Sequence, residues 1–299
     1  MPSFNIIKPS VERINEKDNL RRIELAGRVC YKSEKKITEG SARAFCDQIL
    51  KRGHTSVLEH SNVIVRVPDS LAVKILDARY LYKQVTQKTS MIDIDTRKSD
   101  QWLVSGNMRA WYETLSIGSS VLTFSGHPLL DVNDLDNLAP YVISEEDLTD
   151  EERLNHSRIT LRIVCDRGVS HELVRHRVMS FSQESTRYVN YGKRGYTFIE
   201  PWWWEHQSGV LKDYMLHNMQ HSAEVYQLMI GVGATPQLAR AVLPNQIKTE
   251  LVITATPVQW AEFLRLRMDK AAHPDMQRIA HMVRDALGAD VPSLEEVDG

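Results

Sequence analysis

The chain has 299 residues, of which 42% are hydrophobic and 25% charged, with 14 Gly and 11 Pro. This composition is typical of a globular protein and excludes collagen, low-complexity disorder and small disulfide scaffolds. The 37 Lys and Arg residues and 39 Asp and Glu residues give a formal net charge of -2. No global positive field is therefore available to hold a nucleic-acid backbone, and any anion site must be local.

The three cysteines, Cys30, Cys46 and Cys165, lie far apart and form no CxxC pair. This spacing fits neither a disulfide framework nor a thiolate zinc site, and it favours a reducing compartment. The first 22 residues contain no continuous apolar segment, and no stretch approaches the ~18 apolar residues that span a bilayer. We therefore expect a soluble, cytoplasmic protein that does not contact membranes.

The amino-terminal part predicts an edge strand at residues 4–8 and helices at 20–31 and 41–51, with Gly53 just beyond the second helix. In the following HTSVLEH segment, Ser56 and Glu59 have capping-box spacing. His54 then lies just outside a helix amino terminus, where it is suited to meeting an anion or a ligand ring. The alternative is that the segment only caps a helix and packs the core.

A strand at residues 63–67 is followed by a long segment of different character, 68–157, which we interpret as an insertion. It predicts helices at 71–83 and 105–115. Between residues 131 and 152 it carries nine carboxylates and no Lys or Arg. Such a run usually forms a solvated surface.

The carboxyl-terminal half predicts a strand at 159–165 with one buried face, then a helix for which Ser170 is the candidate cap. A polar loop at 180–192, a short strand at 195–201 and a long helix at 205–230 follow. Later elements are a strand at 251–254 and helices that begin near Pro236, Pro257 and Pro274. Because no βαβ rhythm is present, we expect a single α+β domain, 1–299, with long helices on a small mixed or antiparallel sheet.

The densest polar cluster lies in RHRVMSFSQESTRY and contains Arg175, His176, Arg177, Ser185 and Arg187. Guanidinium forks and a hydroxyl that converge on one volume suit phosphate oxygens. The alternative is a solvated basic helix face. The preceding strand, the apolar neighbours and the polar loop favour a pocket wall.

A second pattern places Arg267 at helical spacing from Trp260, Phe263 and Leu264, on the stripe that faces the core. A buried guanidinium needs a carboxylate, a phosphate or an electron-rich ring edge as its partner. Arg240, on the preceding helix, is expected to need such a partner as well.

Other chemistries are not indicated. The histidines of HELVRH are five residues apart, so they would not share one metal from a regular helix, and we expect no metal site. No cysteine adjoins a basic cluster, and Ser185 has no evident Asp-His relay. The sequence contains neither GxGxxG nor GxxxxGK[ST].

Four segments in order resemble the flavin-dependent thymidylate synthases. The RHR triplet followed by Ser185 and Arg187 is similar to the signature of that family, and GHTSVLEH is similar to its GHxSxxEH segment. ARAVLP (239–244) and FLRLR (263–267) resemble two further family segments. The resemblance covers roughly residues 18–67 and 156–285, and it leaves out the segment between them.

The resemblance implies that dUMP is converted to dTMP, with methylenetetrahydrofolate as carbon donor and NADPH as reductant through bound FAD, in a homotetramer with shared sites. It implies that FAD is bound by His54, Ser56, Arg175, His176, Arg177, Gln183 and Glu262. It implies that dUMP is bound by Glu172, Arg175, Gln183, Glu184, Ser185, Thr186, Arg187, Arg240 and Arg267. Arg267 would also be catalytic, because a cation beside the ionised uracil lowers the cost of its negative charge.

The chain departs from the family pattern in three places. Ser182-Gln183 stands where Asn-Glu is common, Glu262 stands where the family has an asparagine that contacts flavin, and the segment 256–258 before it lacks an expected Arg. A competing hypothesis from another class is a nucleic-acid-binding module that uses the RHR helix and Trp202, Trp203 and Trp204 as a stacking surface. The net charge of -2 opposes it, and the tryptophans are more typical of core or interface.

Overall fold

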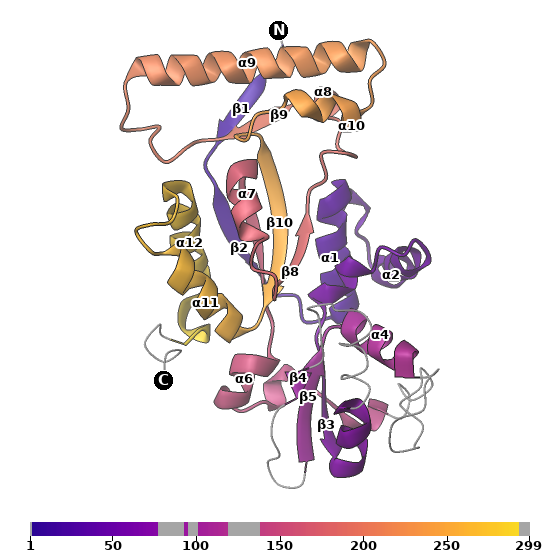
Figure 1. Cartoon of the computed structure of the whole chain (residues 1–299). Helices are drawn as coiled ribbons and strands as arrows, with labels where there is room; N and C mark the ends of the chain where they lie inside the picture. The colour runs from indigo at the N-terminus through magenta and orange to yellow at the C-terminus, as the bar shows by residue number, and fades with distance from the viewer. Residues whose placement is uncertain (1, 77–92, 95–100, 119–137, 293–299) are drawn as a thin grey trace.

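The computed structural model describes residues 2–76, 93–94, 101–118 and 138–292. At its centre is an antiparallel sheet with the strand order β2-β7-β10-β8 (Figure 1). Its strands are β2 (Ser10–Ile14), β7 (Ile159–Asp166), β10 (Lys248–Ala255) and β8 (Ser180–Gln183). Strand β8 lies at one edge, where Gln183 pairs with Leu251. The predicted α+β class is confirmed, and the central sheet is antiparallel.

Alternate residues of this sheet face two different helical layers, as the period of a strand requires. Leu161, Ile163 and Leu251 face one cluster, which includes Trp260 and Phe263. The helices on this side are α7 (Arg167–Leu173), α11 (Pro257–Arg267) and α12 (Pro274–Leu287). Val252 faces the other side and packs on helix α1 (Asn19–Tyr31). Helix α2 (Ser41–Lys51) and the 3₁₀ helix η2 (Thr55–His60) pack on α1.

A second layer lies above the central sheet in Figure 1, where helix α9 (Gly209–Gly231) crosses the molecule. Beneath it, β1 (Phe4–Ile7) and β9 (Tyr196–Ile199) form a two-stranded parallel sheet. Phe198 and Tyr226 are fully buried between them. Two short helices, α8 (Tyr191–Arg194) and α10 (Pro236–Ala239), complete this layer.

A separate antiparallel sheet, β4-β5-β3-β6, lies at the other end of the molecule (Figure 1). Its strands are β3 (Val63–Pro68), β4 (Asp93–Ile94), β5 (Gln101–Gly106) and β6 (Val142–Ile143). Helices α4 (Met108–Gly118) and α6 (Asp150–His156) flank it. A cluster of buried residues that includes Val65, Val104 and Trp111 gives it a core of its own.

The predicted helix at 41–51 is confirmed residue for residue, those at 20–31 and 205–230 are confirmed with small shifts, and helices begin at Pro257 and Pro274 as predicted. The helix predicted at 105–115 starts too early, because Ser105 and Gly106 end strand β5. Helix α4 begins only after Asn107, whose side chain accepts the Ala110 N–H at 2.8 Å. Of the helix predicted at 71–83, residues 71–76 are helical and the remainder lies outside the described residues.

Both predicted caps around the motifs are wrong. Asp166 caps α7 by accepting the Val169 N–H at 2.9 Å, whereas Ser170 donates to the Arg167 carbonyl. The capping box of Ser56 and Glu59 does not form, since η2 begins after His54 and has no side-chain cap. The predicted polar loop at 180–192 begins with strand β8, because residues 180–183 pair with β10.

The acidic run is only partly the solvated surface that was predicted. Within its described part, Ser144 and Thr149 cap two short helices whose first turns carry the carboxylates. Glu152, however, is 4% exposed, and its carboxylate accepts hydrogen bonds from Nη1 and Nη2 of Arg66 at 3.1 and 3.2 Å. None of the described helices has the length and apolar character required to cross a bilayer.

His60 connects η2 to the central sheet. It is completely buried, with Nδ1 2.9 Å from the Thr254 hydroxyl and Nε2 2.9 Å from the Ser182 hydroxyl. Burial, together with the nearby charge of Arg22, lowers the pKa of His60 to about 3. The ring is therefore neutral near pH 7, and it bonds one hydroxyl on each of two adjacent strands.

Replacing Trp260, which is fully buried beneath the sheet, tests this core. Trp260→Ala should lower the free energy of unfolding by about 3–5 kcal/mol, because it removes apolar contact and leaves a cavity. The exposed Arg265 on the same helix provides the control, and Arg265→Ala should change that free energy by less than about 0.5 kcal/mol. Urea unfolding at one protein concentration measures both, and equal losses would contradict the packing described.

The buried neutral His60 predicts a loss of stability in acid. Its folded-state pKa lies below the ordinary value of 6.5, so the unfolded chain binds the proton first as the pH falls. Stability present above pH 6.5 is lost progressively toward pH 3, by about 2 kcal/mol at pH 5. His60→Gln, which keeps a donor and an acceptor but does not titrate, should lose correspondingly less between pH 7 and 5. Identical losses in urea unfolding would show that His60 is not the group responsible.

Candidate functional site

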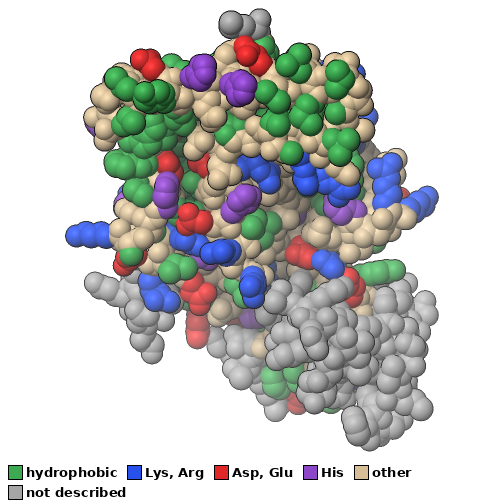
Figure 2. All heavy atoms as spheres, turned by 45° about the horizontal axis from the view of Figure 1, so that its top comes forward, with side chains coloured by type: hydrophobic (Ala, Val, Ile, Leu, Met, Phe, Trp, Pro, Cys, Tyr) green, Lys and Arg blue, Asp and Glu red, His purple; other side chains and the backbone are tan. Residues whose placement is uncertain are grey.

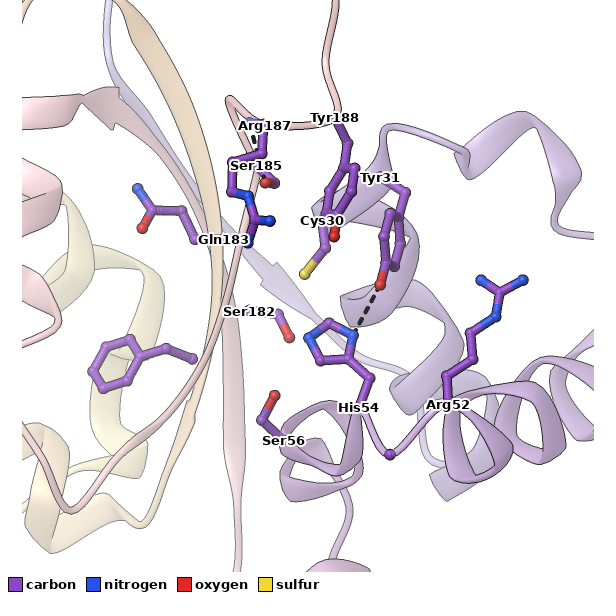
Figure 3. A pocket seen from close by; sticks show the side chains of 12 residues that line it. Cys30, Tyr31, Arg52, His54, Ser56, Ser182, Gln183, Ser185, Arg187 and Tyr188 are labelled. Atoms are coloured by element: carbon purple, nitrogen blue, oxygen red, sulfur yellow. Dashed lines mark hydrogen bonds between the residues drawn. The ribbon is translucent and has the colours of Figure 1, made fainter. Parts of the chain in front are cut away.

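A cavity of about 620 Å³ lies between the end of β8 and the amino-terminal helices. One wall comes from β8 and the loop after it, and the other from the end of α1 and the turn between α2 and η2 (Figure 3). Its lining residues are Cys30, Tyr31, Arg52, Gly53, His54, Ser56, Phe181, Ser182, Gln183, Ser185, Arg187 and Tyr188. Segments far apart in the sequence therefore form one site.

The cavity is suited to an anion. Of the described residues that line it, two are arginines, Arg52 and Arg187, and none carries a carboxylate. Arg187 is exposed, and its Nε donates to the neutral side chain of Gln237 at 2.9 Å, so its charge is not compensated there. Hydroxyl groups of Ser56 and Ser185 add further donors. Guanidinium and hydroxyl donors together match phosphate oxygens.

Aromatic side chains from both walls of the cavity meet at one side of it. The Tyr31 hydroxyl lies 2.9 Å from Nδ1 of His54, and the Tyr31 and Tyr188 ring centroids are 5.5 Å apart (Figure 3). Burial raises the pKa of Tyr31, so the phenol stays protonated at neutral pH. When Tyr31 donates this bond, Nε2 of His54 carries the ring proton and can donate it to a ligand. A planar ligand ring can also stack on these aromatic faces.

The backbone around His54 follows from local chemistry. Gly53 has φ = 66°, a conformation that glycine adopts without strain and that turns the chain from α2 into η2. His54 is the residue before η2, and Ser56 lies in its first turn. The prediction that His54 flanks a helix amino terminus is confirmed, although the helix is of the 3₁₀ type.

A second group of expected site residues lies on the other face of the sheet. Nη1 of Arg267 donates to the Glu172 carboxylate at 2.8 Å, and Nη2 donates to the Glu172 carbonyl at 3.1 Å. Nε donates to Nε2 of His176 at 3.0 Å. The prediction that Arg267 is partly buried and paired is confirmed, since its side chain is 14% exposed and its charged partner is a carboxylate.

His176 is held as a neutral ring in this group. Its centroid lies 4.9 Å from that of Phe263, and burial, together with the Arg267 charge, lowers its pKa to about 4. Because Nε2 accepts from Arg267, Nδ1 carries the ring proton. Helix α7 ends at Leu173, so the RHR triplet lies in the turn that follows and not on a helix face.

Gln183 connects the two groups. Its backbone borders the cavity, whereas its side chain points away, toward α7 (Figure 3). There Nε2 donates to the Ser170 hydroxyl at 2.9 Å and to the Thr249 hydroxyl at 3.2 Å. Ser182, the preceding residue, points to the opposite face and meets His60.

The remaining expected residues differ in their environments. Glu184 is 4% exposed and accepts from Nζ of Lys248 at 2.8 Å, so its charge is already paired. Thr186 is buried and lies 3.4 Å from Nη1 of Arg240. Arg240 itself is exposed, which corrects the expectation that it needs a buried partner. Arg175, Arg177 and Glu262 are also exposed.

The single volume expected from RHRVMSFSQESTRY does not form within one chain. Of the expected site residues, the cavity is lined by His54, Ser56, Gln183, Ser185 and Arg187. The triplet and Arg267 are not among its described lining residues. Sequence reasoning missed Tyr31 and Arg52, which lie at helix ends with no local pattern. Arg52 immediately precedes Gly53 and the GHTSVLEH segment, which was the available indication for it, whereas Tyr31 lies 22 residues before Gly53 and had no such signal.

The cysteines and the acidic residues offer no alternative chemistry. Burial raises the pKa of all three thiols, in the case of Cys46 to about 11, so they are protonated at neutral pH. All three cysteines are free. Across the part of the chain that the structure describes, no group of three or more His, Cys, Asp or Glu side chains could hold a metal ion.

Comparison with known protein sequences identifies the family of the chain. The sequence model of a family described as thymidylate synthase complementing protein matches residues 13–87 and 133–293. The stretch between these ranges, 88–132, lies inside the segment that we interpret as inserted. Both motif regions that form the cavity lie within the match.

Several relatives are named flavin-dependent thymidylate synthase. The protein of Geobacter sulfurreducens is 32% identical over 130 residues, which cover 42% of this chain and 55% of the relative. Those of Thermococcus onnurineus and Corynebacterium efficiens are 30% and 28% identical over 138 and 157 residues, covering 44% and 47% of this chain and 54% and 62% of the relatives. The matched part thus spans only about half the length of these curated relatives. The family model, in contrast, extends over well over half of this chain, which therefore belongs to the thymidylate synthase complementing protein family.

Proposed function

We propose that the protein is an FAD-dependent thymidylate synthase, which methylates dUMP to dTMP with methylenetetrahydrofolate as carbon donor and NADPH as reductant. The observation that carries this proposal is the cationic cavity. It brings the GHTSVLEH segment against the loop with Ser185 and Arg187, without a carboxylate among its described lining residues. The relatives are named for flavin dependence and thymidylate synthesis, which supports the same assignment.

The residues present fit a flavin nucleotide. The arginines and hydroxyls suit the pyrophosphate, and the adjacent rings of Tyr31, His54 and Tyr188 suit a planar ligand ring. The family resemblance assigns His54, Ser56, Gln183, Glu262 and the RHR triplet to this role. FAD, when bound, supplies the reducing equivalents that the new methyl group requires. The protein residues bind it and orient it, and the His176 ring carries its proton on Nδ1 because Nε2 accepts from Arg267.

For dUMP, we propose that Ser185, Thr186, Arg187 and Arg240 hold the phosphate and ribose. Glu172, Arg175, Gln183 and Glu184 belong to the same set by resemblance. The Glu184 carboxylate forms an ion pair with Lys248, so the role of Glu184 in dUMP binding is to position the loop through that pair. Arg267 contacts the uracil, where its charge makes the ionised ring less costly and the ring carbon more nucleophilic.

The separation of the two groups on opposite faces of the sheet supports a site shared between copies of the chain. Helix α9 offers a surface for such an assembly, since Figure 2 shows apolar side chains gathered over this layer. Val210, Tyr214, Leu228 and Val232 are 60%, 72%, 68% and 87% exposed along it. Exposed apolar residues in such a row are typical of an interface. We therefore propose a homo-oligomer, with the homotetramer expected from the resemblance, that combines one copy's cavity with another copy's Arg267.

The nucleic-acid hypothesis finds no support in these contacts. His176 is turned toward Arg267, and Trp203 and Trp204 lie against each other with centroids 5.9 Å apart. Only Trp202 of the aromatic cluster is exposed, by 45%. A cytoplasmic location remains a prediction from the sequence.

The proposal predicts a yellow protein. Purified protein should show flavin absorption near that of bound FAD, and adding dUMP should perturb the band because the two ligands share one site. Reduction by NADPH and formation of dTMP from dUMP and methylenetetrahydrofolate measure the activity. Protein that is colourless and cannot be reconstituted with FAD would refute the assignment.

Arg267→Ala should keep the flavin but lose turnover. Removing one cation aimed at a developing negative charge typically lowers kcat about 100-fold or more. Arg265→Ala, two residues away and exposed, is the matched control and should retain kcat. Steady-state dTMP formation and the flavin spectrum are measured on both variants. Unchanged kcat in Arg267→Ala would remove this residue from the mechanism.

A further inference from the structure

Helix α4 reaches the motif region from a stretch that the family pattern does not cover. It spans Met108–Gly118, within the unmatched residues 88–132. Nη1 of Arg109 contacts the Glu59 carboxylate in η2, and its Nε donates to Glu113 of the same helix at 2.9 Å. The Arg109 and Glu59 side chains are only 18% and 16% exposed, so the pair is largely screened from water.

Further contacts attach the same helix to the same segment. The Met108 N–H donates to the Ser61 hydroxyl at 2.8 Å, and Nε1 of Trp111 donates to the Val63 carbonyl at 3.1 Å. Helix η2, which carries Glu59, also packs on strand β8, which begins at Ser180. Glu59 therefore lies where α4, η2 and the edge strand meet.

The cavity depends on where η2 lies. This six-residue 3₁₀ helix has no side-chain cap, and 3₁₀ geometry gives poorer hydrogen bonds than an α-helix. Its position must therefore come from tertiary contacts. Its carboxyl end is bound by Glu59 and His60, and its amino end carries His54 and Ser56 into the cavity.

We infer that Arg109 is a positioning residue of the cavity, contributed by a helix outside the family pattern, which holds Glu59 and through it keeps His54 and Ser56 placed for FAD. This inference rests on the proposed flavin function. Arg109 is not among the described residues that line the cavity, so it acts through Glu59. Removing Arg109 would leave the largely buried Glu59 carboxylate without its cation. The cost of this unpaired buried charge would displace η2, which carries Glu59.

The test uses Arg109→Met, Glu59→Gln and the double variant, each as purified holoenzyme. FAD release on dilution is measured by flavin fluorescence, well below the melting temperature of every variant. Arg109→Met should raise the FAD dissociation constant about tenfold. Adding Glu59→Gln should return it to within about twofold of the value for Glu59→Gln alone, because a neutral amide at this position needs no cation. If the Arg109–Glu59 pair contributed only to the stability of the fold, the FAD dissociation constant would show neither the increase nor its reversal.

Arg66→Met is the matched control, since it removes another largely buried ion pair, between Arg66 of β3 and Glu152 of α6, which includes no residue of η2. It should lower the melting temperature and leave the FAD dissociation constant unchanged. The inference fails if Arg109→Met binds FAD like the wild type, if Arg66→Met weakens FAD equally, or if the Arg109 and Glu59 effects simply add. Wild-type protein that binds no flavin would overturn the proposed function instead.

Discussion

The alternation of side chains along the edge strand β8 is the constraint on which the site depends. Ser182 faces α1 and η2 and is bonded to His60, whereas Gln183 faces α7 and is bonded to Ser170. Consecutive residues of one motif are thus directed to opposite faces of the central sheet. Ser185, Arg187 and Tyr188, which follow β8, line the cavity, whereas His176 of the triplet that precedes β8 is bonded to Arg267 of α11. The expected site residues of one chain therefore lie in two groups on opposite faces of the sheet, and the proposal of shared sites rests on this separation.

Charge is distributed so that the cavity stays cationic. The Glu250 carboxylate forms ion pairs with Lys32, Lys248 and Arg162, and the Glu184 carboxylate forms an ion pair with Lys248. Burial by itself raises the pKa of Glu250, but these cations more than offset it and lower the pKa to about 2. The Glu250 carboxylate therefore remains ionised, and Glu184 is paired with the same Lys248. The described contacts of the Arg187 guanidinium, with the Gln237 amide and the Tyr188 ring, are with uncharged groups, so its charge remains available to an anionic ligand.

The second sheet is attached to the site by chain connectivity as well as by contacts. Strand β3 follows η2 after a link of only two residues, and β5 and β6 pair with it on its two sides. A rigid sheet built on β3 restricts the segment immediately before it, which carries the GHTSVLEH motif. The stretch absent from the family pattern thus contributes to the environment of a motif that belongs to the family pattern.

The sequence by itself determined most elements and the motifs, because helix periodicity, strand alternation and turn glycines act locally. It determined α2, the paired and half-buried state of Arg267, and the family to which the chain belongs. Only the tertiary structure decided that Glu59 pairs with Arg109, and that Tyr31 and Arg52 line the cavity. Those outcomes depend on contacts between residues far apart in the chain, and local spacing carries no information about which distant partner a side chain will meet.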